Sequence, residues 1–356
     1  MTKGAGKKKV FVGLSGGVDS AVSAALLQKE GYDVTGVFIR IALPGYPCSA
    51  GEDQLEAMRV AAHLRIPFLA IDLSEEYKKT VFDSSIKEFG KGRTPNPDAL
   101  CNREIKFGLF FDWCMQQGAD LVATGHYAQT KNGQLFMGAD PEKDQSYFLW
   151  AVPEAKLRQT LFPVGGFKKE QVRKLAAKFK LPNAQRKDSQ GLCFLGPVSL
   201  DDMLHQELTL IPGDVLNEEG EVVGRHEGAP AYTPGQRHGF ELAAKSPESV
   251  PHYVIAKDRE FNTITVSPER YPKGVRQTTL ELSEENWIGE APDGPCSARY
   301  RYRQTLIPAI KTGSTVTLLE PHYAPEGQSL VLYRGERCLG GGVILTVRHG
   351  DINRKS

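Results

Sequence analysis

The sequence predicts an N-terminal α/β domain with a parallel sheet, a small central domain and a C-terminal antiparallel β-barrel. In the first third of the chain, strand-like apolar runs alternate with helix-like stretches, which is typical of a parallel sheet covered on both faces. After Gly196-Pro197, short alternating runs rich in Gly and Pro replace this pattern. From about residue 275, short strands separated by turn residues indicate a small barrel. We therefore expect domains over 1–197, 198–272 and 273–356.

The individual elements follow from the spacing of apolar residues and from their flanking Gly and Pro. In the first domain we expect strands at 9–14, 34–39, 68–72 and 120–124, and helices at 19–31, 54–64, 75–89 and 103–117. A basic amphipathic helix over 168–180 ends at Leu181-Pro182. In the barrel we expect strands at 278–282, 296–302, 315–319, 329–333 and 341–347.

Composition indicates an ordinary globular protein. The chain has 356 residues, of which 40% are hydrophobic and 24% charged. No apolar run is long enough to span a bilayer, and we expect a cytoplasmic protein with no membrane partner. Six cysteines without a C-x-x-C pair argue against a disulfide framework and an ordinary zinc site. A net charge of +1 neither supports nor excludes nucleic-acid binding, which would depend on local basic faces.

A glycine-rich turn, Ser15-Gly-Gly-Val-Asp-Ser20, follows the first predicted strand and opens the first helix. Glycines let backbone N–H groups approach an anion, and the positive end of the helix points to the same place. The absence of a lysine excludes a Walker A site. Ser15 and Ser20 offer hydroxyls, and Asp19 offers a carboxylate for magnesium. A plain strand–helix connection is the alternative, but the string matches the signature of the ATP pyrophosphatases. Gly125-His126-Tyr127 is expected at the same edge of the sheet.

A second segment, Gly92 to Phe107, contains two prolines that stiffen the backbone. If Asn96 caps a turn and Pro97 is its first residue, Asp98 and Cys101 share one side. The carboxylate raises the thiol pKa, whereas Arg103, Lys106 and the helix start lower it. The sequence leaves the sign of the net shift open.

The remaining cysteines are more ambiguous. Cys193 lies in an apolar patch bounded by glycines, which fits either a moving loop or a core strand. Cys114, Cys296 and Cys338 are expected to pack in the interior, and Cys48 lies in a Pro/Gly loop.

Two basic segments are candidates for RNA-binding surfaces. The run Arg299-Tyr-Arg-Tyr-Arg-Gln304 alternates with the period of a strand, which predicts three guanidinium groups on one face and two rings on the other. A solvated charged face over a tyrosine-lined core is the alternative. For the lysines and arginine of the helix at 168–180 (Lys168, Lys169, Arg173, Lys174) we expect an ordinary exposed face.

Seven motifs together resemble the bacterial-type tRNA-specific 2-thiouridylase family, in order along nearly the whole chain. They are SGGVDS at 15–20, GRTPNPDALCNREIKF at 92–107, ATGHYA at 123–128, KDQSYFL at 143–149, DSQGLCFLG at 188–196, TPGQRHG at 233–239 and RYRQ at 301–304. The resemblance implies an ATP-binding PP-loop domain, a small central domain and a tRNA-binding β-barrel. It also implies that the C2 oxygen of the wobble uridine, U34, is replaced by sulfur.

The resemblance assigns a role to each matching position. ATP contacts fall on Gly13, Leu14, Ser15, Gly16, Gly17, Val18, Asp19, Ser20, Ile39 and Gly125. Contacts with tRNA fall on Asn96, Pro97, Asp98, Lys143, Asp144, Gln145, Arg301, Tyr302, Arg303 and Gln304. Cys101 matches the family's nucleophile and Cys193 its persulfide carrier.

The expected cofactors are ATP and Mg²⁺. The expected partners are the anticodon region of a tRNA and a persulfide-donating sulfur carrier or cysteine desulfurase. Some relatives carry Cys where this chain has Asp98, and an iron–sulfur cluster has been proposed for part of the wider family. With two converging cysteines such a cluster lacks ligands unless Cys48 or a non-thiolate group joins it, so we expect the persulfide route.

The implied chemistry begins with adenylation, because a uridine oxygen is a poor leaving group until it is part of AMP. A Cys193 persulfide would then supply sulfur, Cys101 would attack the sulfur–sulfur bond and Asp98 would transfer a proton. Two alternatives stay open: an amide-forming ligase of the ATP pyrophosphatase group, and a tRNA-binding protein without catalysis.

Overall fold

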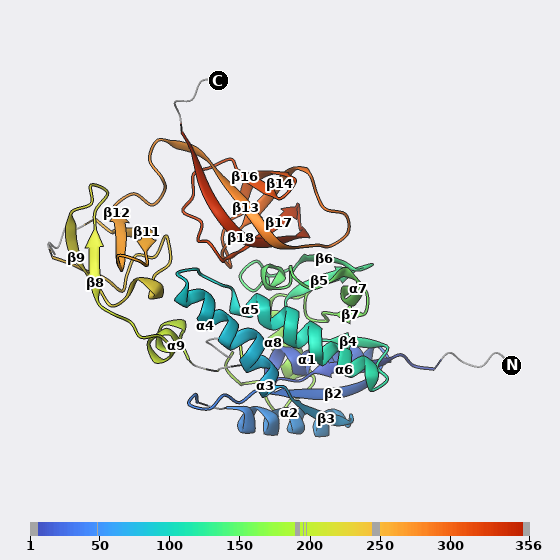
Figure 1. Cartoon of the computed structure of the whole chain (residues 1–356). Coiled ribbons are helices and arrows are strands. Elements are labelled where there is room, and N and C mark those ends of the chain that lie inside the picture. The colour runs from blue at the N-terminus through green and yellow to red at the C-terminus, as the bar shows by residue number, and fades with distance from the viewer. Residues whose placement is uncertain are drawn as a thin grey trace.

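The computed structural model describes residues 6–47, 49–188, 193–194, 196, 198–243 and 250–351. Its first domain contains a parallel sheet of order β3-β2-β1-β4-β7 (Figure 1). The strands are β1 (Lys9–Gly13), β2 (Asp33–Arg40), β3 (Phe68–Asp72), β4 (Leu121–Ala123) and β7 (Thr160–Leu161). The predicted α/β fold class is confirmed.

Helices cover both faces of this sheet, as the alternation predicted. Val10 and Val12 of β1 pack with α1 (Val18–Lys29), α2 (Ala50–Leu64) and α8 (Lys169–Lys178) on one face. Phe11 points to the other face, toward the helical segments 74–90 and 97–116. The strand period of two therefore divides the domain into two apolar layers.

The two helical segments on the second face each contain a π-helical stretch. The first consists of α3 (Ser74–Tyr77), η1 (Lys78–Phe82) and α4 (Asp83–Gly90). The second consists of α5 (Pro97–Leu100), η2 (Cys101–Phe110) and α6 (Phe111–Gln116). This second segment begins before the predicted residue 103, because Asn96 accepts a hydrogen bond from the Ala99 N–H at 3.1 Å and Pro97 is the first helical residue.

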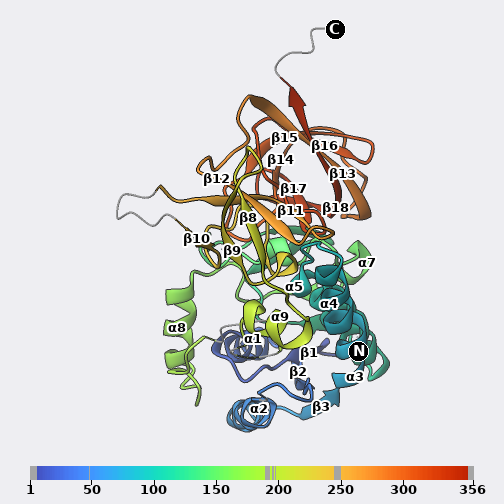
Figure 2. The ribbon, with the colours of Figure 1, turned by 60° about the vertical axis from the view of Figure 1, so that its left-hand side comes forward.

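The central domain is a small mixed sheet of order β10-β9-β8-β12-β11. Its elements are α9 (Leu200–Glu207), β8 (Gly213–Leu216), β9 (Val222–His226), η4 (Ala229–Ala231), β10 (Glu241–Leu242), β11 (Tyr253–Asp258) and β12 (Thr263–Ser267). Figures 1 and 2 show this domain in yellow (β8, β9) and light orange (β11, β12) beside the orange and red barrel, with α9 leading to it from the first domain.

The C-terminal domain is an antiparallel barrel in which β13 pairs with β18 to close the sheet. Its strands are β13 (Val275–Trp287), β14 (Gly294–Arg299), β15 (Ile307–Thr312), β16 (Thr315–Leu318), β17 (Ser329–Arg334) and β18 (Arg337–Asp351). The barrel prediction is confirmed, although strand β15 was not expected and the predicted strand 296–302 ends early, at Arg299.

The first domain and the barrel share a sheet and a core. The hairpin of β5 (Ala128–Lys131) and β6 (Gln134–Met137) joins the barrel, with Leu135 opposite Cys338 of β18, and Figure 1 shows it directly beneath the barrel. The helical turns η3 (Ser146–Phe148) and α7 (Glu154–Leu157) lie next to it. Tyr147 and Trp150 pack with Val331 and Tyr333 in one apolar cluster. Within the described ranges, no helix has the length and apolarity needed to span a membrane.

Candidate active site

The glycine-rich turn forms an anion-binding loop between β1 and α1. Gly16 has a φ of +77°, and a Cβ there would lie 2.6 Å from the Asp53 carbonyl oxygen, so only glycine fits. The hydroxyl oxygens of Ser15 and Ser20 lie 3.2 Å apart. No side chain of the described residues caps the first turn of α1, which leaves its N–H groups available to a phosphate.

The predicted ATP contacts converge around this turn. Gly13 ends β1 and Leu14 follows it. The Leu14 N–H donates to the Val37 carbonyl of the neighbouring strand β2 at 2.8 Å, and Ile39 lies further along β2. Gly125 lies against the start of α1, since an added Cβ would be 2.7 Å from the Ser20 nitrogen. Val18 is the buried first residue of α1. These positions share one edge of the sheet, as expected for the carboxyl ends of parallel strands.

Asp19 is held by two groups from outside the turn. Its carboxylate accepts hydrogen bonds from Lys169 at 2.8 and 2.9 Å and from the Tyr127 hydroxyl at 2.8 Å. The expectation of an ordinary exposed helix face at 168–174 is therefore wrong for Lys169, which points inward from α8 to Asp19. It was missed because its carboxylate partner is 150 positions away in the sequence.

A second carboxylate, Asp188, forms ion pairs with three cations beside the turn. Lys169, Lys143 and Arg173 lie 2.8, 3.0 and 2.6 Å from it. Burial alone would raise its pKa, but hydrogen bonds from the two lysines lower the pKa of Asp188 to about 2. The expectation of an ordinary exposed face is therefore also wrong for Arg173, which is paired with Asp188. The result is a basic cluster next to the phosphate-binding turn.

The two predicted sulfur residues meet in the structure. The Sγ atoms of Cys101 and Cys193 lie 3.4 Å apart. Cys101 is buried at the start of η2, and Cys193 is partly exposed. The Cys193 backbone is held at both ends, because its N–H donates to Asp98 at 3.3 Å and its carbonyl accepts from the Tyr77 hydroxyl at 2.8 Å.

The two thiols have opposite pKa shifts, which answers the question that the sequence left open. Burial, followed by the neighbouring sulfur, raises the pKa of Cys101 well above its usual value. A hydrogen bond from Cys101, assisted against burial by the charge of Lys106, lowers the pKa of Cys193 to about 7. Burial also raises the pKa of Asp98. Cys193 is therefore the sulfur that ionises first, beside a carboxyl group that retains its proton more readily than usual.

Of the two cations near Cys101 in the sequence, only Lys106 faces the thiols. Arg103 instead pairs with Glu104 at 2.7 Å and with Glu284 of the barrel at 3.0 Å. The Lys106 ammonium lies 3.4 Å from Nε2 of His126, and Nδ1 of His126 lies 2.7 Å from the Thr124 hydroxyl. Burial and then the Lys106 charge lower the pKa of His126, so the ring is neutral and accepts from Lys106.

The short loop at 124–127 contacts both halves of the candidate site, the anion-binding turn and the thiol pair. Gly125 lies against the start of α1 and Tyr127 bonds Asp19 at the anion-binding turn. Between them, His126 contacts Lys106 at the thiol pair. The sequence predicted that this loop lies at the turn, but it did not reveal the contact between His126 and Lys106. The only sequence clue to it is that His126 stands between Gly125 and Tyr127, which both contact the turn. The two half-sites are therefore adjacent parts of one site.

The residues predicted to contact tRNA lie in three places. Asn96 and Pro97 start the helix that carries Asp98. Lys143 pairs with Asp188, and Gln145 accepts a hydrogen bond from the Tyr127 N–H at 3.0 Å. The Asp144 side chain is buried, so it has no surface to offer to RNA.

The predicted alternating strand at 299–304 is wrong. β14 ends at Arg299, which is buried and paired with Asp144. The chain then turns, with Arg303 at a φ of +60°. Arg301 and Arg303 instead line a cavity of about 200 Å³ at the edge of the barrel, and Tyr302 packs on Phe148 with ring centroids 4.7 Å apart. The basic and aromatic groups thus remain together, on a turn.

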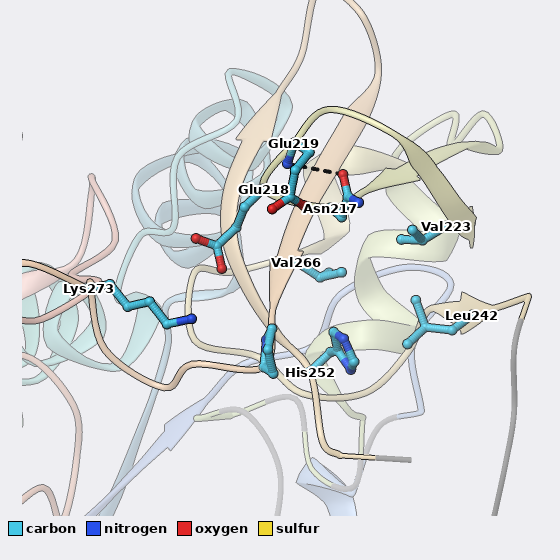
Figure 3. A pocket seen from close by; sticks show the side chains of 9 residues that line it. Asn217, Glu218, Glu219, Val223, Leu242, His252, Val266 and Lys273 are labelled. Carbon is cyan, nitrogen blue, oxygen red and sulfur yellow. Dashed lines mark hydrogen bonds between the residues drawn. The ribbon is translucent and has the colours of Figure 1, made fainter.

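A larger cavity of about 420 Å³ lies in the central domain. Figure 3 shows Glu218 and Lys273 on one side of it, Asn217 and Glu219 at another, and His252 across from them. None of the predicted site residues lines it.

The other cysteines contribute no metal site to the described residues. Cys114 and Cys338 are buried and Cys296 is partly buried, as expected for packing. Cys48 lies outside the described residues. In the described ranges, no group of three or more His, Cys, Asp or Glu side chains is placed to hold a metal ion.

Three family models match successive parts of the chain. They are the tRNA methyl transferase HUP domain over residues 8–197, the tRNA methyl transferase PRC-barrel domain over 201–268 and the aminomethyltransferase beta-barrel domain over 277–344. The tRNA-specific 2-thiouridylase MnmA of Enterococcus faecalis is 41% identical, with 95% of each chain covered. The protein of the same name from Pseudomonas fluorescens is 42% identical over 95% of each chain. With this extent of similarity and the paired thiols beside an anion-binding turn, the chain belongs to the tRNA-specific 2-thiouridylase family of enzymes.

Proposed function

We propose that this protein thiolates tRNA: it adenylates the C2 oxygen of the wobble uridine with ATP and replaces that oxygen with sulfur delivered by Cys193. The observation that carries the proposal is the 3.4 Å separation of the Cys101 and Cys193 sulfurs. The loop at 124–127 connects this pair to the anion-binding turn, because it contacts both. An ATP-dependent ligase that forms amides needs the turn but has no use for the two thiols.

ATP fits the turn because uncapped N–H groups, two serine hydroxyls and a cluster of cations converge there. Lys169 is placed to neutralise charge that develops on the phosphates when pyrophosphate leaves. A magnesium ion is usually held by phosphates and one or two carboxylates, and Asp19 would hold it in exchange for its present lysine partner. Bound there, the ion would supply further neutralisation of the phosphates.

The sulfur step follows from the thiol geometry. The terminal sulfur of a Cys193 persulfide attacks the adenylated C2, and AMP leaves with the electron pair of the C–O bond. The Cys101 thiolate then attacks Sγ of Cys193 and breaks its bond to the transferred sulfur, which stays on the uridine. Asp98 takes up the Cys101 proton. A Cys101–Cys193 disulfide remains, and an external dithiol must reduce it before the next turnover.

Substrate and donor are both large molecules in this proposal. The tRNA would meet the protein at the start of α5, at Lys143 and Gln145, and at the barrel turn that carries Arg301 to Gln304. The partly exposed Cys193 would accept its persulfide sulfur from a sulfur carrier or a cysteine desulfurase.

The direct test is incubation of unmodified tRNA with the protein, ATP, a persulfide donor and a dithiol, followed by nucleoside mass spectrometry. We expect 2-thiouridine in the anticodon loop and AMP in equal amounts. Cys101→Ser and Cys193→Ser should abolish the thiolated product, and Cys338→Ser, a buried cysteine in a different apolar cluster from the pair, is the matched control. AMP-forming turnover into another product by both serine variants would instead support a ligase, and tRNA binding without AMP would support a non-catalytic protein.

A further inference from the structure

The π-helical segment η2 determines which residues face the thiol pair. A helix with i→i+5 hydrogen bonds has more residues per turn than an α-helix, so residues five positions apart lie closer to one face. Cys101 and Lys106 have this spacing. In an α-helix they would point in different directions, because neighbours on one face are three or four positions apart. The wide turn therefore brings Lys106 toward the side of Cys101, and its ammonium lies 5.6 Å from the ring centroid of Phe194, the residue after Cys193.

Gly108 makes this wide turn possible. It has non-helical angles (φ −93°, ψ −105°) inside η2. A Cβ at this position would lie 2.8 Å from the Arg103 carbonyl oxygen, five residues earlier. Any other residue would push that carbonyl away. A glycine at position 108 thus permits the π-helix.

The half-buried Lys106 ammonium needs an anion, since an unpaired charge removed from water is costly. The groups around it are the Cys193 and Cys101 sulfurs, the Asp98 carboxyl group and the neutral His126 ring. Burial alone would lower the pKa of Lys106, but these sulfurs and Asp98 outweigh burial and raise it. His126 accepts one ammonium hydrogen but carries no charge.

We propose that Lys106 is a positioning residue whose charge balances the negative sulfur of Cys193, and that the π-helix holds it there. The same charge serves the thiolate that receives sulfur and, on the basis of the proposed function, the persulfide anion that attacks C2. Asp98 competes with Cys193 for the Lys106 charge. The Cys101 thiol donates to the Cys193 sulfur, and the Tyr77 hydroxyl holds the Cys193 backbone. This role is separate from the phosphate-binding turn.

The test is the pH dependence of Cys193 alkylation by iodoacetamide, followed by peptide mass spectrometry on protein without ATP or tRNA. The wild-type midpoint is expected at about pH 7. Lys106→Met should raise it by about one pH unit, which is an approximately tenfold slower reaction below the midpoint. Lys106→Arg should keep most of the wild-type behaviour. Lys91→Met, which removes an exposed lysine paired with Glu88, is the matched control and should change nothing.

A second variant keeps the test decisive if Lys106→Met does not fold. Asp98→Asn removes the competing carboxylate, so the full Lys106 charge acts on Cys193 and the midpoint should fall. An unchanged midpoint in folded Lys106→Met, or an unchanged or raised midpoint in Asp98→Asn, overturns the proposal. Because the assay contains no substrate, absence of tRNA thiolation with the expected shifts would overturn the proposed function alone.

Discussion

Asp144 and Arg299 form a buried ion pair that links the first domain to the barrel, although 155 positions separate them. The Arg299 guanidinium also donates to the Tyr333 hydroxyl at 2.7 and 3.0 Å. Asp144 in turn accepts from the Gly138 and Ser146 N–H groups, each at 3.0 Å. The pair therefore fixes the segment before η3 against the barrel, next to Lys143 and Gln145, which we propose to contact tRNA.

Breaking this pair should destabilise the protein strongly. Arg299→Met leaves a buried, uncompensated carboxylate, and we expect a loss of about 3–5 kcal/mol in the free energy of unfolding. Urea denaturation followed by fluorescence measures it. The double change Asp144→Asn with Arg299→Met should recover part of the loss, since no charge is then stranded. Arg348→Met removes an exposed pair with Glu281 and should cost at most about 1 kcal/mol. Equal losses in both single variants would refute a special role for the buried pair.

Stability should fall as the pH drops below about 6.5, the usual histidine pKa. Burial and the Lys106 charge lower the pKa of His126 in the folded state. Between the two pKa values, His126 is therefore protonated in the unfolded chain and neutral in the folded chain. The contribution is complete above the unfolded pKa and is lost as the pH falls toward the folded one. His126→Gln should make the unfolding free energy less dependent on pH between about pH 6.5 and pH 5.

The control for this pH effect is His205→Gln. His205 is exposed, and the hydrogen bonds that it donates to the Asp201 carbonyl and the Glu227 carboxylate raise its pKa. Its contribution is therefore complete below about pH 6.5 and is lost only as the pH rises, so His205→Gln should leave the dependence between about pH 6.5 and pH 5 nearly unchanged. Denaturation midpoints measured across this range compare the two variants. A His126→Gln protein with the wild-type pH dependence would contradict the neutral, buried ring.

Lys169 should matter for ATP cleavage although it stands in a helix that looks like an exposed basic face. Lys169→Met removes the cation from Asp19 and Asp188, and we expect AMP formation to slow by about 10²–10³-fold, the usual cost of losing one charge-stabilising group. Lys174→Met, on the exposed side of the same helix, is the control. AMP release in a tRNA-dependent assay measures both. Equal rates in the two variants would remove Lys169 from the site.

The barrel turn should contribute to tRNA affinity through charge. Arg301→Ala and Arg303→Ala should weaken binding and flatten its dependence on salt, by about 0.7–0.9 in the slope for each phosphate that is no longer neutralised. Filter binding at several salt concentrations gives the slopes. Arg59→Ala, an exposed arginine paired with Glu56 on α2, should leave both affinity and slope unchanged. A wild-type slope in both turn variants would place the RNA elsewhere.

Much of the fold was predictable because the apolar period differs between strands and helices, as at Val10, Phe11 and Val12. Features that depend on distant partners were not. The β5–β6 hairpin is four residues per strand and pairs with β18 some 200 positions later. Strand β15 was hidden by Pro308, and the run at 299–304 kept the strand period although Arg303 turns the chain.

The candidate site was predictable in part for the same reason. Local signals located the glycine-rich turn, the capped helix at Asn96 and the individual cysteines. Their assembly was not visible, because Cys101 and Cys193 are 92 positions apart. The alignment of Lys106 with Cys101 was hidden too, since it depends on the π-helical turn.

The central claim is that Cys193 carries the sulfur and Cys101 releases it. One measurement tests this most directly: a single turnover of Cys193-persulfidated protein with tRNA and ATP, without a reductant, followed by non-reducing peptide mass spectrometry. The account predicts one 2-thiouridine for each Cys101–Cys193 disulfide, and, in Cys101→Ser, a tRNA trapped on Cys193 through a disulfide to the transferred sulfur. Full release of 2-thiouridine by Cys101→Ser, with no disulfide formed in the wild type, would contradict it.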